Sequence, residues 1–154
     1  MAWTPKRLDT PRLILQATGE GESSDTAASR RVGLPNQWRV IPKDREHVVG
    51  LVGFIRWEPE RRCAEIGFGL AKAAAGQGYM TEACRAVIAY GWSEMGLSRI
   101  EARCQLANAA SARVLEKIGM TRRGVIRGRV HSKAPEEEFW LYAIEREGAH
   151  APDR

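Results

Sequence analysis

The feature that most constrains the fold is a strand-like segment joined to a helix-like segment by a turn that carries two glycines. Residues Cys63–Leu70 alternate between apolar side chains on one face and Glu65 with two glycines on the other, as in a β-strand. Residues Tyr79–Met95 place apolar side chains at helical spacing, and Gly96 can end this helix because glycine tolerates the left-handed conformation. A strand, a tight turn and a helix in succession predict an α/β fold.

The rest of the chain predicts further strands and a second helix. Short apolar or alternating runs predict strands at Arg12–Gln16, Trp38–Ile41, Val48–Trp57, Ile100–Cys104, Val125–Val130 and Phe139–Ile144. Asn108 can cap a helix at Ala109–Ile118, which Gly119 ends. We therefore expect one domain over residues 1–154, with a mixed α/β (α+β) sheet partly covered by helices.

Composition excludes several classes of protein. No apolar run approaches the roughly 20 residues that span a bilayer, and the charged N-terminal segment is unlike a signal peptide, so we expect no membrane partner. Cys63, Cys84 and Cys104 are odd in number and widely spaced, which argues against disulfides and a metal site and suits a cytoplasmic protein. The net charge of +5 and the pI near 9.4 favour acidic ligands without choosing among phosphates, nucleic acid and acidic proteins.

The turn Gly76-Gln77-Gly78 is a candidate phosphate-binding loop. Glycines let backbone N–H groups approach a phosphate, and the helix that follows adds the positive end of its dipole. A phosphate would contact Ala74–Met80 through the main chain. The turn is neither a Walker A loop nor a GxGxxG motif, and it follows four strands, unlike the first unit of a Rossmann fold. Taken alone, it is weak evidence and is more typical of simple strand–helix packing.

Together with its surroundings, the turn resembles the GNAT family of acetyl-CoA-dependent N-acetyltransferases. The resemblance is carried by AEIGFGL at 64–70, GQGYMTEA at 76–83 and IEARCQLANAASARVLEKIGM at 100–120. TPRLIL at Thr10–Leu15 is similar to the opening of the branch that acetylates N-termini of ribosomal proteins. The resemblance covers residues 10–17 and about 48–147, and it implies a mostly antiparallel sheet of about seven strands.

The resemblance implies which residues bind acetyl-CoA. The family's Q/R-x-x-G-x-G/A turn holds the pyrophosphate and matches residues 73–78, except that Ala73 replaces Gln or Arg and removes one side-chain contact. Asn108 and Ser111 match an Asn-x-x-Ser pattern near the cofactor sulfur, but capping of the second helix is the alternative for both. The cofactor-binding residues expected are Phe68, Gly69, Leu70, Ala73, Ala74, Ala75, Gly76, Gln77, Gly78, Tyr79, Met80, Asn108 and Ser111.

The same resemblance implies direct transfer of the acetyl group to an amine, with no metal and no covalent intermediate. Glu65 would be the base that deprotonates the amine through water, with a structural carboxylate as the alternative. Ser111 would protonate the leaving thiolate, while Tyr142 is either a substitute acid or a core tyrosine. The main-chain N–H of Leu70 would polarise the carbonyl.

One departure from the family affects the acceptor side. Relatives place two helices between their first and second strands, whereas only the polar stretch Thr18–Arg31, with a possible short helix at Ala27–Val32 capped by Ser24 or Asp25, fills this position here. The shortened connection would leave Leu34 and Trp38 in water, which predicts a homodimer with residues 18–40 near its interface. The alternative is a monomer in which the short helix at Ala27–Val32 covers this edge.

Two other functions stay open beside acetyl transfer to a small amine or to a protein or peptide N-terminus. The shortened connection and Ala73 would suit a non-catalytic CoA-binding or protein-interaction module. The basic pI would suit a nucleic-acid binder, but aromatic and basic residues do not alternate on one strand, so no nucleic-acid partner is expected.

Overall fold

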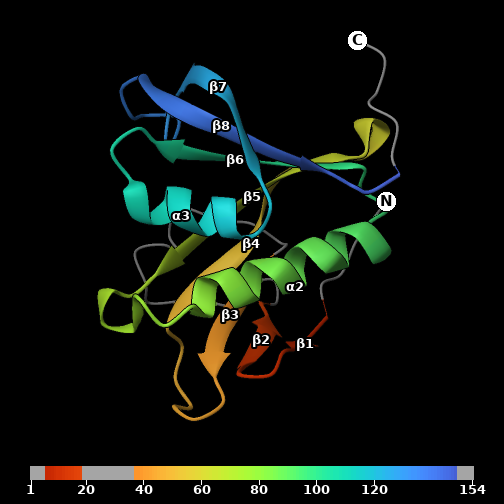
Figure 1. Cartoon of the computed structure of the whole chain (residues 1–154), viewed down its shortest axis with the longest axis vertical. Coiled ribbons are helices and arrows are strands. Elements are labelled where there is room, and N and C mark those ends of the chain that lie inside the picture. The colour runs from red at the N-terminus through yellow and green to blue at the C-terminus, as the bar shows by residue number, and fades with distance from the viewer. Residues whose placement is uncertain (1–5, 19–36, 149–154) are drawn as a thin grey trace.

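The computed structural model of the chain describes residues 6–18 and 37–148, which form one sheet with two α-helices on one of its faces (Figure 1). The strands are β1 (Leu8–Asp9), β2 (Leu13–Ala17), β3 (Gln37–Pro42), β4 (Gly50–Glu58), β5 (Cys63–Leu70), β6 (Arg99–Gln105), β7 (Thr121–Gly128) and β8 (Glu137–Glu145). The helices are α2 (Tyr79–Ser93) and α3 (Ala109–Lys117), and two 3-10 turns are η1 (Pro59–Arg61) and η2 (Lys72–Ala74). The helix considered at Ala27–Val32, with its caps Ser24 and Asp25, lies outside the described residues.

The sheet confirms the predicted fold class, with eight strands rather than about seven. Their order is β1-β2-β3-β4-β5-β6-β8-β7, and every neighbouring pair is antiparallel except β5 and β6. The predicted strand at Cys63–Leu70 has the observed bounds. The last strand pair begins earlier than expected, at Thr121 instead of Val125, because Thr121 and Arg122 already pair with β8 ahead of a bulge between Arg122 and Gly124.

The hydrophobic core lies between the sheet and α2. The helix buries the apolar positions that its spacing predicted, namely Met80, Ala83, Cys84, Val87, Ile88 and Gly91, together with Tyr79 and Tyr90. A Cβ on Gly91 would lie 3.0 Å from Leu97 Cδ1 and 3.1 Å from Phe54 Cζ, so glycine lets the helix approach the strands closely. Both α2 and α3 lie in front of the strands in Figure 1, and we call this the helix face of the sheet.

Trp38 corrects one expectation from the sequence. It is completely buried, not exposed to water, and its ring meets the ring of Tyr90 edge-on with 5.2 Å between the centroids. Its indole N–H donates to the carbonyl of Lys6 at 2.7 Å. The tyrosine of α2 and the segment before β1 thus cover a position that we expected a missing helix to leave open. Trp38 therefore gives no support to a dimer interface.

The sheet opens between its two parallel strands. β5 and β6 pair only at Cys63–Arg99, Ala64–Ile100 and Glu65–Glu101. Beyond these pairs, β5 continues against β4 and β6 continues against β8, so the two strands move apart. We call this opening the β5–β6 gap. Within the described ranges, no helix is long and apolar enough to cross a bilayer.

Candidate functional site

A cavity of about 990 Å³ occupies the β5–β6 gap and extends to the beginnings of α2 and α3. The predicted site residues that line it are Glu65, Phe68, Gly69, Leu70, Ala75, Gly76, Gly78, Tyr79, Met80, Asn108 and Ser111. The structure thus brings together residues from β5, the following turn and both helices. Ala73, Ala74, Gln77 and Tyr142 do not line this cavity. Ala74 is buried at 2% exposure because η2 turns it towards the core.

The turn before α2 presents its backbone N–H groups outward. Gly76 and Gly78 have φ values of 82° and 77°, the left-handed region that glycine occupies without strain. The N–H groups of residues 76–81 have no acceptor among the described residues. A Cβ on Gly76 would meet nothing within 4 Å, so an incoming group can approach this backbone. Free N–H groups at a helix start form a site that fits a phosphate.

Gln77 is held on the side of the turn away from the cavity. Its carbonyl accepts from Arg12 Nη1 at 2.8 Å, and its side-chain oxygen accepts from Arg45 Nη2 at 3.0 Å. The guanidinium carbons of the same two arginines lie 4.9 Å and 5.8 Å from the ring centroid of Tyr79. The turn therefore contributes Ala75, Gly76 and Gly78 to the cavity, and Gln77 interrupts this stretch.

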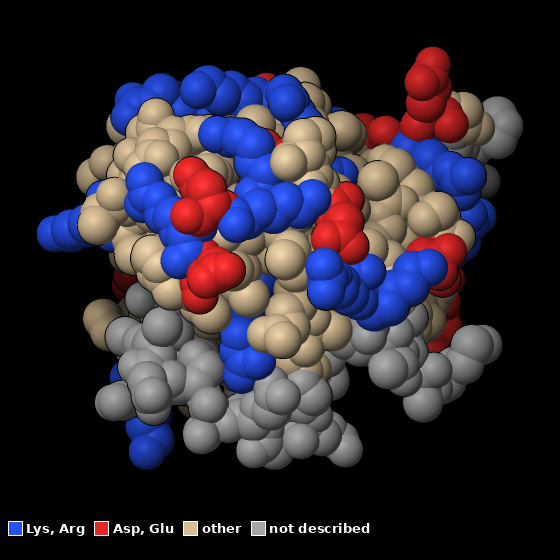
Figure 2. Space-filling view, turned by 90° about the horizontal axis from the view of Figure 1, so that it is seen from below, with Lys and Arg blue, Asp and Glu red and all other residues tan. Residues whose placement is uncertain are grey.

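Positive side chains line the cavity at positions that the sequence analysis missed. Lys72, Arg113 and Lys117 line it and form no ion pair with the described residues. Arg113 and Lys117 are four residues apart on α3, a spacing that places them on one helix face and was a signal available in the sequence. Figure 2 shows basic side chains spread over one side of the molecule with acidic ones among them, and the net charge of +5 suits an anionic ligand.

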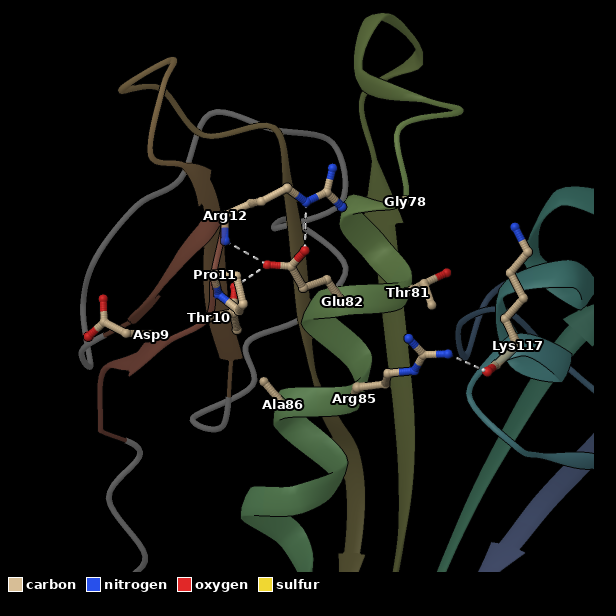
Figure 3. A pocket seen from close by; sticks show the side chains of 10 residues that line it. All are labelled: Asp9, Thr10, Pro11, Arg12, Gly78, Thr81, Glu82, Arg85, Ala86 and Lys117. Carbon is tan, nitrogen blue, oxygen red and sulfur yellow. Dashed lines mark hydrogen bonds and ion pairs between the residues drawn. The ribbon is translucent and has the colours of Figure 1, made fainter.

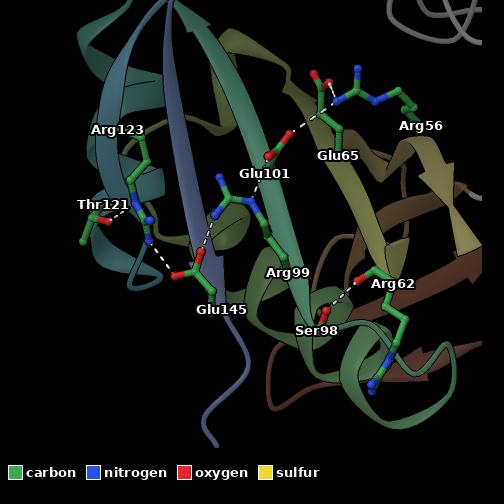
Figure 4. Close-up of polar contacts among 9 residues, drawn as sticks. All are labelled: Arg56, Arg62, Glu65, Ser98, Arg99, Glu101, Thr121, Arg123 and Glu145. Carbon is green, nitrogen blue, oxygen red and sulfur yellow. Dashed lines mark hydrogen bonds and ion pairs between the residues drawn. The ribbon is translucent and has the colours of Figure 1, made fainter. Parts of the chain in front are cut away.

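Glu65 is buried, with 3% of its surface exposed, and both of its oxygens have arginine partners. Oε2 accepts from Arg103 Nε at 2.9 Å, and Oε1 lies 3.5 Å from Arg56 Nη2. Figure 4 shows that the contact between Glu65 and Arg56 is part of a row of alternating charges that crosses the sheet. The row is formed by Arg56, Glu101, Arg99, Glu145 and Arg123. The row fixes the orientation of the Glu65 carboxylate, and its role as a base stays a prediction.

Asn108 and Ser111 meet at the beginning of α3. The side-chain oxygen of Asn108 accepts from the backbone N–H of Ser111 at 3.1 Å, so capping occurs as the alternative reading expected. Both residues also line the cavity, and the hydroxyl of Ser111 has no hydrogen-bond partner among the described residues. Capping therefore uses the Ser111 backbone and leaves its hydroxyl available.

Tyr142 stands apart from the other predicted catalytic residues. It is fully buried, and its hydroxyl accepts from Arg122 Nη2 at 2.9 Å and donates to Glu116 at 3.2 Å. Burial raises the pKa of Tyr142; the hydrogen bond from Arg122 opposes this effect and the one to Glu116 adds to it. These contacts are those of a core tyrosine.

The three cysteines are free and buried. Burial raises the pKa of the Cys63, Cys84 and Cys104 thiols, so little thiolate forms near neutral pH. None of the three lines the cavity. These cysteines are therefore poorly suited to accept an acyl group.

Comparison with known proteins gives consistent matches over most of the chain. A family model described as an acetyltransferase (GNAT) domain matches residues 3–121. An uncharacterized N-acetyltransferase of Bacillus licheniformis, p20, is 29% identical over 73% of this chain and 63% of its own length. The ribosomal-protein-serine acetyltransferase of Escherichia coli is 28% identical over 92% of this chain and 78% of its own length.

The fold also matches solved structures. The crystal structure of a GNAT-family acetyltransferase from Bacillus anthracis superposes with a TM-score of 0.74 and 26% identity, covering 92% of this chain and 99% of that one. The chain spans about 60% of the length of the first curated relatives that it matches.

Proposed function

The chain belongs to the acetyltransferase (GNAT) domain family, and from this premise we propose that it is an acetyl-CoA-dependent N-acetyltransferase that moves an acetyl group directly to a primary amine. The observation that supports this function most strongly is the set of free N–H groups at residues 76–81. These residues form the turn before α2 and the beginning of α2, beside the cavity in the β5–β6 gap. Pyrophosphate needs such donors, and the cations of Lys72, Arg113 and Lys117 add charge of the required sign.

The residues of the gap divide the chemistry among them. Acetyl-CoA would supply the acetyl group as a thioester, whose carbonyl carbon a neutral amine attacks. The N–H of Leu70, at the end of β5, would donate to the carbonyl oxygen as charge develops there. Glu65 would take the amine proton through water, and Ser111 would give its hydroxyl proton to the sulfur as the carbon–sulfur bond breaks. The proton taken up by Glu65 would then return through water to the Ser111 oxygen, which restores both residues. The acetyl group would pass straight from the sulfur to the nitrogen, without a covalent enzyme intermediate.

The acceptor that we favour is the N-terminus of a protein or peptide. The relative named ribosomal-protein-serine acetyltransferase, which matches 92% of this chain, supports this class. Small primary amines are the second class to be tested.

Product analysis by mass spectrometry tests both classes. The protein is incubated with acetyl-CoA and a panel of N-terminal peptides and small amines, while released CoA thiol is measured in parallel. We expect acetylated α-amines together with an equal amount of CoA. Tight CoA binding without acetylation of any amine in the panel would instead make the chain a CoA-binding module.

Two further properties belong to this proposal. A cytoplasmic location is supported by the free cysteines, which suit a reducing compartment. A homodimer would now rest on residues 19–36, which lie outside the described residues, because Trp38 is buried. Light scattering at micromolar concentrations tests it: twice the chain mass of 17.2 kDa supports the dimer, and 17.2 kDa throughout excludes it.

A further inference from the structure

The segment Thr10-Pro11-Arg12 has no part in the proposed chemistry, but it forms hydrogen bonds with the first turn of α2 (Figure 3). Glu82, on that turn, receives three hydrogen bonds from it. Its Oε2 accepts from the Thr10 hydroxyl at 2.5 Å and from the Arg12 backbone N–H at 2.9 Å. Its Oε1 accepts from Arg12 Nε at 2.7 Å. One carboxylate thus ties the beginning of β2 to the beginning of the helix.

Arg12 extends this contact to the phosphate-binding turn itself. Its Nη1 donates to the carbonyl of Gln77 at 2.8 Å, and its guanidinium carbon lies 4.9 Å from the ring centroid of Tyr79. A Cβ on Gly78 would lie 3.2 Å from Arg12 Nη2, so the guanidinium also closes over the back of this glycine. Arg12 therefore lies against three consecutive residues, Gln77 and Gly78 of the turn and Tyr79 of α2.

The turn needs support of this kind. Gly76 and Gly78 have wide conformational freedom, and Gly78, the N-cap residue of α2, provides no side-chain cap. The outward N–H groups of residues 76–81 add no hydrogen bonds within the described chain that would fix their direction. Converging donors bind an anion well only when their geometry is set in advance.

We propose that Glu82, acting through Arg12, is a positioning residue that holds the turn at residues 76–78 in the conformation that binds the CoA pyrophosphate. This inference takes its ligand, CoA, from the proposed function. The positioning contacts themselves are the hydrogen bonds among Thr10, Arg12, Glu82 and Gln77.

Whether Glu82→Gln weakens or tightens CoA binding distinguishes a positioning role of Glu82 from a purely electrostatic effect of its charge. Glu82 is negative and lies on the first turn of the helix that would bind an anion, so charge alone predicts that Glu82→Gln tightens CoA binding. Positioning predicts the opposite, because Glu82 accepts with both of its oxygens, whereas glutamine has one acceptor oxygen and an NH2 group that would face a donor. We expect Glu82→Gln to weaken CoA binding about tenfold in calorimetry, the scale for losing such bonds. The control is Glu94→Gln, which makes the same change at the far end of α2 and should leave the affinity unchanged.

A second variant tests the fork geometry of Arg12. Arg12→Lys keeps the charge, but an ammonium cannot bond Glu82 and Gln77 through two separate nitrogens of a rigid plane. It should weaken CoA binding several-fold while kcat at saturating acetyl-CoA stays near that of the wild type, since the reacting groups are untouched. Arg7→Lys, in an exposed pair with Asp9, is the matched control.

The measurement without ligand is nitrogen-15 relaxation of the amides of Gly76, Gln77 and Gly78. Glu82→Gln should increase their fast motion, whereas Glu94→Gln should not. Unchanged motion, or CoA binding as tight as in the wild type, would overturn the positioning role. A wild-type protein that fails to bind CoA would overturn the proposed function instead, and the relaxation comparison would still decide the role of Glu82.

Discussion

Arginine holds both Glu65 and Glu82, but the two carboxylates are suited to different tasks. Glu65 lines the cavity and faces two guanidinium groups, a position on which its proposed role as the base depends. Glu82 joins strand β2 to helix α2, outside the β5–β6 cavity. Burial alone would raise the pKa of Glu82, but the hydrogen bonds from Thr10 and Arg12 outweigh burial and hold the pKa below its ordinary value of 4.5.

This lowered pKa predicts a pH-dependent stability. A carboxyl group with a lower pKa in the folded state stabilises the fold above its unfolded-state pKa, and the contribution disappears as the pH falls through the folded-state pKa. At neutral pH, Glu82→Gln should therefore reduce the free energy of unfolding by about 1–3 kcal/mol. The difference should shrink as the pH falls below 4.5.

Urea denaturation of both proteins from neutral to acid pH measures this difference. Glu138→Gln is the control, because it removes the same charge from a carboxylate that has no ion pair among the described residues. A difference that stays constant with pH would show that Glu82 does not stabilise the fold through its charge.

Ser111 allows its catalytic role to be tested without disturbing the helix that carries it. Alanine retains the backbone N–H that Asn108 caps, so α3 should begin as before. Ser111→Ala should lower kcat roughly 10–100-fold, within the range for losing a positioned proton donor, while CoA binding is retained. Steady-state kinetics with Ser132→Ala as the exposed control measures this. Turnover equal to the wild type would assign the proton to solvent.

The strands and helices that could be predicted from the sequence are those in which the spacing of apolar residues matches the buried face. Strand β5 and helix α2 carry clear patterns, and the packing follows them. β7 is an edge strand that begins with a threonine followed by two arginines, so no apolar alternation marks its beginning. β1 has only two residues and depends on its pairing with β2, a long-range fact that a local pattern does not contain.

The parts of the candidate site that depend on backbone conformation were predictable from the sequence. The direction in which individual side chains face was less predictable. The glycines of the turn have the positive φ values that their role requires. A contiguous motif could not show that η2 buries Ala74 or that Gln77 turns away from the cavity. The position of Tyr142 on the helix face follows from the register between β6 and β8, which the sequence does not specify.

Gly50, the first residue of β4, pairs with the last residue of β5, and the close approach of the two backbones requires glycine there. A Cβ there would lie 2.4 Å from the carbonyl oxygen of Gly69, an atom that cannot move without displacing the strand. Gly50→Ala should therefore reduce the free energy of unfolding by about 1–3 kcal/mol.

Gly96→Ala provides the comparison, because its Cβ would meet nothing within 4 Å and only its φ of 66° opposes the change. Its expected cost is about 1 kcal/mol. Denaturation in urea ranks the two variants, and a smaller loss for Gly50→Ala would contradict the steric argument.

For the molecule as a whole, the net charge of +5 and the unpaired cations along the cavity predict salt-sensitive binding. CoA affinity should fall by about tenfold between roughly 0.05 and 0.5 M salt, because screening weakens attraction between exposed charges. The double variant Arg113→Gln with Lys117→Gln should bind more weakly at low salt and show a flatter salt dependence.

Arg127→Gln with Lys133→Gln removes the same charge outside the cavity, and calorimetry at several salt concentrations compares the two variants. Equal salt dependence in both would indicate a general effect of net charge and would contradict a local role for α3.

The three residue pairs between β5 and β6 also have a mechanical consequence. They make the sheet two antiparallel panels, β1 to β5 and β6 to β7, connected by a short hinge. A ligand in the gap would contact β5 on one panel and β6 on the other, so it would link the two panels across the hinge. Forced separation of the panels must then break the ligand contacts as well as the hinge, and the force needed to unfold a single molecule becomes a measure of occupancy.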